Sequence, residues 1–164
     1  MQAVRKLAVI CALAALSVTG TASAYTRAPG DGTLLIKDGI GKVTLTAKGG
    51  VIGHYAEGVL TVRDPNPDDN VSEVVTGAES THIVNDFVTK YTGKDVRFRY
   101  IGGRFTITLV GSNIDLSVIG KGSVSVVGKG TADDGTYSLN GQTAQPFPGP
   151  FFPLTLQLSA TSSG

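Results

Sequence analysis

The sequence predicts an all-β fold: an antiparallel β-sandwich or barrel built from short hairpins with glycine turns. Two observations lead to this prediction. Apolar residues recur at every second position through most of the chain, which places them on one face of a strand. The chain also has 22 glycines, and they interrupt the alternation at short intervals, as tight turns between strands do.

The clearest alternation lies in the second half of the chain, from Asp95 onward. Apolar residues there form four successive runs: Val96, Phe98 and Tyr100; Phe105, Ile107 and Leu109; Ile114, Leu116 and Val118; Val124 and Val126. Glycine-containing breaks such as Gly102-Gly103 separate the runs. Because short runs with two- or three-residue breaks are typical of hairpins, we predict an antiparallel meander of about five strands ending near Leu139.

The other strands are predicted less sharply. Apolar runs at 34–36, 43–47, 51–52 and 60–62 indicate strands in the first half, and Leu154, Leu156 and Leu158 indicate a last one. The proline-rich residues 145–153 cannot form a central strand, because proline has no N–H to donate. Residues 80–91 fit a short helix and irregular strands equally well.

Two arrangements of these strands fit the pattern. A sandwich or barrel buries its apolar face against a second sheet, whereas a β-solenoid stacks repeats of about nine residues along an axis. A solenoid needs a strict repeat, and the spacing holds only from Phe105 to Val126. We therefore expect the sandwich and keep the β-solenoid as the alternative.

The first 24 residues are typical of a cleavable secretory signal peptide. Arg5 and Lys6 give a positive start, an apolar run follows, and Ala22-Ser23-Ala24 supplies the small residues that precede a cleavage site. We expect cleavage near Ala24 and a product in the cell envelope or outside the cell, with no later membrane span. Its expected parts are a tail over 25–32, a single β domain over 33–158 and a tail over 159–164.

Cleavage also changes the chemistry of the chain. It removes Cys11, the only cysteine, so the exported product has no disulfide and no thiol. It removes Arg5 and Lys6 as well, which leaves 12 Lys and Arg against 13 Asp and Glu. This balance argues against nucleic acid or an anionic membrane as a partner held by bulk charge.

One loop is a candidate calcium site. Asp64, Asn66, Asp68 and Asp69 place side-chain oxygens close together in a polar stretch with two prolines, and such oxygens can converge on a hard cation. The loop departs from an EF-hand, which would have glycine where Asp69 stands and glutamate where Val75 stands. The alternative is a solvated loop, and we expect no other cofactor.

Catalytic motifs are not evident in the sequence. His54 and His82 lack the short spacing of zinc sites, and no G-x-S-x-G nucleophile elbow is present. Two of the 13 acids could still meet in space as the carboxylate pair of a glycoside hydrolase. We do not expect an enzyme, and an extracytoplasmic hydrolase with paired carboxylates is the alternative.

Two groups of residues are candidates for a partner surface. Arg97, Arg99 and Arg104 are expected to share the polar face of two adjacent strands; a solvated face that deters edge pairing is the simpler interpretation. The aromatic residues Phe147, Phe151 and Phe152 lie in the proline-rich segment, where exposure would make them a contact surface.

Residues 93–141 also resemble a known group of proteins. The stretch contains Gly-Lys-Asp-Val-Arg-Phe-Arg, Gly-Ser-Asn-Ile-Asp-Leu-Ser, Gly-Lys-Gly-Ser-Val and Asp-Gly-Thr-Tyr-Ser-Leu-Asn-Gly. It is similar to a family of uncharacterised secreted bacterial proteins of the high-GC actinobacterial type. The resemblance covers about a third of the chain; it implies export and β structure and no particular chemistry.

These observations together favour an exported β domain with a binding or structural role. The expected partner is an envelope or extracellular protein or a polysaccharide. A self-assembling β-rich subunit, and hence a homo-oligomer, is a further alternative, and an exposed straight edge strand would favour it.

Overall fold

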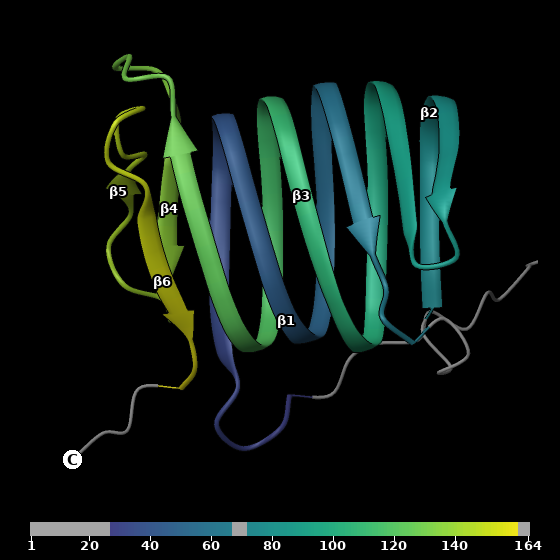
Figure 1. Cartoon of the computed structure of the whole chain (residues 1–164). Helices are drawn as coiled ribbons and strands as arrows, with labels where there is room; N and C mark the ends of the chain where they lie inside the picture. Colours follow the sequence, from purple (N-terminus) through teal and green to yellow (C-terminus); the bar gives the residue numbers. More distant parts are fainter. Residues whose placement is uncertain (1–26, 67–71, 161–164) are drawn as a thin grey trace, which may run out of the picture.

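The computed structural model describes residues 27–66 and 72–160, which form an all-β antiparallel sandwich without a helix (Figure 1). The predicted signal peptide over 1–24, Asp68 and Asp69 lie outside the described residues. The strands are β1 (Gly32–Arg63), β2 (Ser72–Asn85), β3 (Val88–Gly128), β4 (Thr136–Leu139), β5 (Gln145–Pro146) and β6 (Leu154–Leu158). The described part therefore contains no helix that could cross a membrane.

The two longest strands, β1 and β3, build most of the molecule by pairing with each other twice. Val43 of β1, for example, pairs with Leu109 of β3 on one side and with Val126 of β3 on the other. Both strands bend repeatedly and cross between two layers, as Figure 1 shows, with β2 at one end of the stack and β4, β5 and β6 at the other.

We name the two layers after the short strands at their ends. The β4 layer contains residues 33–37 and 51–55 of β1, 72–76 of β2, 96–101 and 114–118 of β3, and β4 and β5. The β6 layer contains residues 42–48 and 59–63 of β1, 80–85 of β2, 88–92, 104–110 and 121–127 of β3, and β6. Neighbouring segments are antiparallel throughout both layers.

Glycines line the two edges where the strands pass from one layer to the other. One edge carries the cross-strand row Gly128, Gly41, Gly111, Gly58 and Gly93, and the opposite edge carries Gly32, Gly120, Gly49 and Gly102. At Gly49 a Cβ atom would lie 2.1 Å from the carbonyl oxygen of Ile119. Glycine is needed there because only a residue without a side chain lets the two backbones approach so closely.

The prediction of short hairpins is therefore wrong, although the prediction of an antiparallel sandwich is confirmed. The glycine breaks bend continuous strands instead of reversing them, so successive runs of β3 pair with β1 and not with each other. The sheet is also open, with β2 at one end and β5 and β6 at the other, which excludes a closed barrel. A solenoid is excluded because neighbouring segments alternate between two antiparallel strands.

The core lies between the two layers and follows the predicted alternation. Its buried hydrophobic residues are Leu34, Ile36, Val43, Leu45, Ala47, Val51, Tyr55, Leu60, Val62, Val96, Phe98, Tyr100, Phe105, Ile107, Leu109, Ile114, Leu116, Val118, Val124, Val126, Phe147 and Leu158. The rings of Tyr100 and Phe105 meet across the layers with centroids 5.6 Å apart. Burying such side chains provides about 1.5–3 kcal/mol each relative to exposure.

The structure also decides the secondary structure of the segments whose sequence pattern fitted more than one form. Residues 80–91 form parts of β2 and β3 and no helix. The proline segment contributes only β5, which sits at the end of the sheet where a missing N–H costs nothing. The predicted last strand is confirmed as β6, which pairs with residues 122–126 of β3.

A buried carboxylate fastens the loop that follows β3. Asp134 accepts hydrogen bonds from the backbone of Gly130 and from the backbone and hydroxyl of Thr131, at 3.0 Å for the Thr131 amide. Burial alone would raise the pKa of Asp134, but these hydrogen bonds outweigh it and hold the pKa below its usual value. The carboxylate is therefore a structural anchor of this loop.

Candidate ligand-binding face

The outer face of the β4 layer carries two adjacent rows of outward-pointing side chains. Cross-strand pairing sets Val74, Arg99, Ile52, Ser117 and Leu35 in one row. The next row holds Thr76, Arg97, His54 and Asp115, and Lys37 continues it through an ion pair with Asp115. Because strands lie about 4.8 Å apart, each row is a line of closely spaced groups from five segments of the chain.

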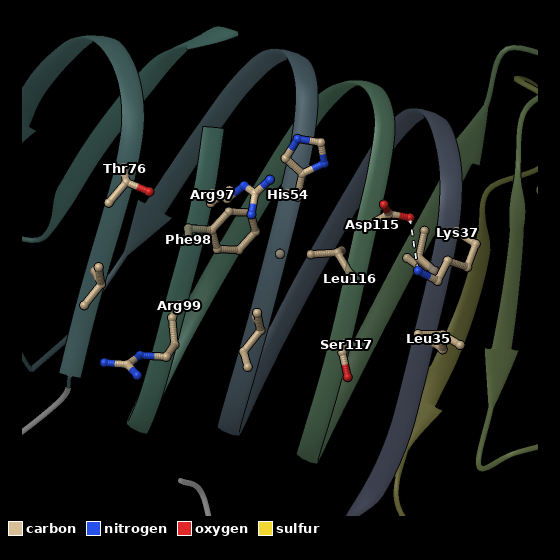
Figure 2. Close-up of a pocket in the computed structure, with 14 residues that line it drawn as sticks. Leu35, Lys37, His54, Thr76, Arg97, Phe98, Arg99, Asp115, Leu116 and Ser117 are labelled. Atoms are coloured by element: carbon tan, nitrogen blue, oxygen red, sulfur yellow. Dashed lines mark ion pairs between the residues drawn. The ribbon is translucent and has the colours of Figure 1, made fainter. Parts of the chain in front are cut away.

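These two rows line a shallow depression of about 660 Å³, shown in Figure 2. Three apolar side chains in it remain strongly exposed: Ile52 at 59%, Leu35 at 44% and Val74 at 42%. Exposed aliphatic side chains are common singly, but here three share one row with Arg99. The depression is therefore apolar along one row and charged along the other.

Its charges are mostly basic. Arg97, Arg99 and Lys37 line it together with His54, whereas Asp115 is the only carboxylate among the lining residues that the structure describes. The Lys37 Nζ lies 3.7 Å from the Asp115 Oδ1, as the dashed line in Figure 2 marks, and Asp115 also accepts the backbone N–H of Asp38 at 3.2 Å. Asp115 is thus engaged by two groups, which leaves an excess of positive charge on this face.

The histidine in the depression has one acidic neighbour. His54 Nε2 lies 3.6 Å from Oδ1 of Asp95, which is too long for a hydrogen bond. Asp95 itself stands at a bend of β3 with a φ of 52° and is largely exposed. The hydrolase alternative needs two carboxylates facing one another across the substrate, and the lining of this depression supplies one. The groups present are suited to binding.

The structure brings two of the three predicted arginines onto one face and separates the third, while their role as a partner surface stays a prediction. Arg97 and Arg99 point outward from the same segment of β3 into the depression. Arg104 follows the bend at Gly102-Gly103 and pairs with Lys48 in the β6 layer, so it lies on the opposite side of the molecule. The chain crosses between layers where the sequence pattern predicts a hairpin.

The predicted aromatic surface is also divided. Phe147 is 8% exposed and belongs to the core, where its ring fills the space beside Gly39, so its assignment to a partner surface is wrong. Phe151 and Phe152 are 85% and 78% exposed and lie in the turn before β6. They remain candidates for a contact surface, separate from the depression.

Only part of the candidate calcium loop is described. The backbone N–H of Asn66 donates to Oδ1 of Asp64 at 2.8 Å, which is a local turn made by the side chain. Asp68 and Asp69 lie outside the described residues. Within 27–66 and 72–160 no group of three or more His, Cys, Asp or Glu side chains could hold a metal ion. The calcium site stays a prediction.

The sequence interpretation missed the apolar row and the place of His54 in the depression. A signal for the apolar row was available, because Leu35 and Ile52 interrupt the alternation at positions where it calls for polar residues. An apolar residue at an outward position of a half-buried strand is a useful indicator of a binding surface. His54 carries no comparable signal.

No family model, curated protein or solved structure matches this chain. The face described above therefore has to be interpreted from its own chemistry.

Proposed function

We propose that the chain is an exported binding module that docks an envelope or extracellular protein on the outer face of its β4 layer. The observation that carries this proposal is the row of exposed apolar side chains beside a row rich in basic groups. Protein interfaces combine an apolar centre with a polar rim and are enriched in arginine. The partner surface that complements this face has apolar side chains next to carboxylates.

The sequence features that predict export also support this proposal. The signal-peptide pattern at 1–24 and the resemblance of 93–141 to secreted bacterial proteins both favour a role outside the cytoplasm. A binding role also suits a framework in which long paired strands hold the outward side chains in fixed rows.

A peptide titration tests the chemistry of this face. The probe is a short labelled peptide of alternating Glu and Leu, compared with Lys-Leu and Glu-Ser peptides of the same length. We expect the Glu-Leu peptide to bind at least about tenfold more tightly than either, which corresponds to about 1.4 kcal/mol. Fluorescence anisotropy of the labelled peptide gives the dissociation constants.

Two variants locate the binding. Ile52→Ser removes the central apolar side chain, and Arg97→Gln removes a charge that no described carboxylate pairs; each should weaken binding of the Glu-Leu peptide. Lys42→Gln, which makes the same charge change on the β6 layer, is the matched control. Equal binding of all three peptides, or equal loss in the control, would contradict the proposal.

A further inference from the structure

The outer face of the β6 layer has a different and more regular chemistry. Cross-strand pairing aligns five hydroxyl side chains in one row, namely Thr155, Ser125, Thr44, Thr108 and Thr61. The adjacent row holds Ser123, Thr46 and Thr106, and the row after it holds Lys121, Lys48 and Arg104. Three neighbouring segments of the sheet thus each present hydroxyl, hydroxyl and cation in the same order.

The row of cations is costly for folding. Lys48 is paired directly with Lys121 on one side and with Arg104 on the other, and all three side chains are exposed. Like charges directly opposite one another in a sheet are destabilising. The ion pairs among the described residues are Lys37–Asp115 and His54–Asp95, and neither involves these three cations. No acidic residue stands in the three rows. Because no ion pair of the described residues offsets this repulsion, we take a ligand as the explanation for the row.

The hydroxyl groups in the rows beside the cations can still form hydrogen bonds with a ligand. The Oγ1 atoms of Thr46 and Thr106 are 3.2 Å apart, so neighbouring hydroxyls lie in line across the strands. A hydroxyl has one donor and two acceptor positions, so this contact leaves capacity for a ligand. Threonine is also stiff about χ1, which lowers the entropy lost when a ligand is bound.

We propose that this face binds an acidic polysaccharide that runs across the strands. Its carboxylates lie along Lys121, Lys48 and Arg104, which span about 10 Å over two strand spacings. Its sugar hydroxyls exchange hydrogen bonds with the two hydroxyl rows. A single-stranded nucleic acid would use the same cations but needs aromatic side chains for stacking, and none of the residues in these rows is aromatic.

The site stands independently of the proposed protein-docking face. Its residues belong to the β6 layer, whereas the depression belongs to the β4 layer, and the core lies between them. The near balance of charge in the whole chain does not contradict it, because positive charge is concentrated on this face.

Three polymers test the proposal. Polygalacturonate carries carboxylates and sugar hydroxyls, its fully methyl-esterified form has the same backbone without charge, and polyphosphate has charge without sugar. We expect calorimetry to show that polygalacturonate binds, that the ester does not, and that polyphosphate binds more weakly. The affinity for polygalacturonate should fall as salt is added. No binding of polygalacturonate, or tighter binding of polyphosphate, would overturn the assignment.

Substitutions on one face separate a specific site from general charge attraction. Lys48→Gln should weaken binding of polygalacturonate about tenfold or more, and Thr106→Val, which keeps the shape, about fivefold. Lys42→Gln changes the same charge at the other end of the same β1 segment and should have little effect. If Lys42→Gln weakens binding as much as Lys48→Gln, the attraction is nonspecific and the proposed site is wrong. Circular dichroism confirms that each variant is folded.

Discussion

The two outer faces of this sandwich are built mostly from β1 and β3 and yet differ in character. On the β4 layer, exposed Ile52 and Leu35 lie beside a basic row, in which the carboxylate of Asp115 is paired with Lys37. On the β6 layer, ordered hydroxyl rows lie beside three cations, and among the described residues no carboxylate forms an ion pair with them. One face is suited to a protein with apolar and acidic groups, and the other to an acidic polymer rich in hydroxyls.

The difference shows which properties the fold imposes. Alternation decides which residues point inward, and the two rows of glycines decide where the strands change layer. Neither constraint decides the chemistry of the outward positions. We therefore attribute the contrast between the faces to the two binding roles proposed for them.

Gly49→Val should have the largest effect, because it removes the framework that both faces share. A Cβ at this position would lie 2.1 Å from the Ile119 carbonyl oxygen, and the backbone φ of 156° is one that a β-branched residue avoids. We expect a loss of more than about 4 kcal/mol in the free energy of unfolding, or no folded protein at all. Urea unfolding followed by circular dichroism measures it.

The control for this substitution is Gly149→Ala. Apart from Gly149 itself and its two chain neighbours, no atom of the described residues lies within 4 Å of the Cβ position at Gly149, and this residue has no positive φ. The variant should unfold at nearly the same urea concentration as the original protein. A stable Gly49→Val variant would show that the strands do not need glycine where they change layer.

Reciprocal substitutions should show that the two faces bind their ligands independently. Arg97→Gln should weaken the Glu-Leu peptide about tenfold and leave polygalacturonate unaffected, whereas Lys48→Gln should do the reverse. The physical reason is that the two side chains lie on opposite sides of the core. Titration of both ligands against both variants gives four dissociation constants. Parallel losses for both ligands would mean that one surface, or bulk charge, binds both.

The sequence alone predicts the inside of this molecule much better than its topology. Every residue of the alternating runs from Val96 to Val126 that was predicted to be apolar and inward is buried. Pairing was mispredicted because a glycine break can reverse a strand or bend it, and the local pattern is the same in both cases. The partner that decides between them, such as Thr46 for Thr106, is about 60 residues away.

The ambiguity of the glycine breaks also limited the prediction of which arginines share a face. Arg97 and Arg99 share a face because they are two positions apart in one segment, which the period of a strand guarantees. Arg104 was misplaced because a bend, and not a turn, lies between it and Arg99. The hydroxyl and cation rows of the β6 layer could not be predicted, since each row combines distant segments whose alignment depends on the pairing.

The inner faces differ too, and alkaline pH should reveal it. The β4 layer contributes Tyr55 and Tyr100 to the core, and burial raises the pKa of both; for Tyr55 it reaches about 12, despite a lowering contribution from a hydrogen bond with the Leu60 backbone. Because the folded pKa of Tyr55 is above its unfolded value of 10.0, the fold favours the neutral phenol. This stability is complete below pH 10 and is lost as the pH rises through about 12.

Absorbance at tyrosinate wavelengths and circular dichroism, recorded together during an alkaline titration, check this prediction. We expect the ionisation of Tyr55 to accompany the loss of β structure, and Tyr55→Phe to reduce the dependence of stability on pH in this range. At neutral pH the substitution removes a long contact of 3.4 Å between the hydroxyl and the Tyr91 carbonyl oxygen and the hydrogen bond with the Leu60 backbone, so it should cost about 1 kcal/mol there. Ionisation of the buried tyrosines in a fully folded protein would contradict the prediction.

The smallest effect is expected for Lys37→Gln. The Lys37 and Asp115 side chains are 57% and 39% exposed and their charged atoms are 3.7 Å apart, so solvent screens the pair. Its removal should change the free energy of unfolding by less than about 0.5 kcal/mol, and added salt should reduce even that difference. Urea unfolding at low and high salt measures the change. A loss above about 1 kcal/mol would mean that the fold itself needs this pair. A small one means that Lys37 is held loosely enough to exchange Asp115 for an acidic group of the partner, which is what a docking face requires.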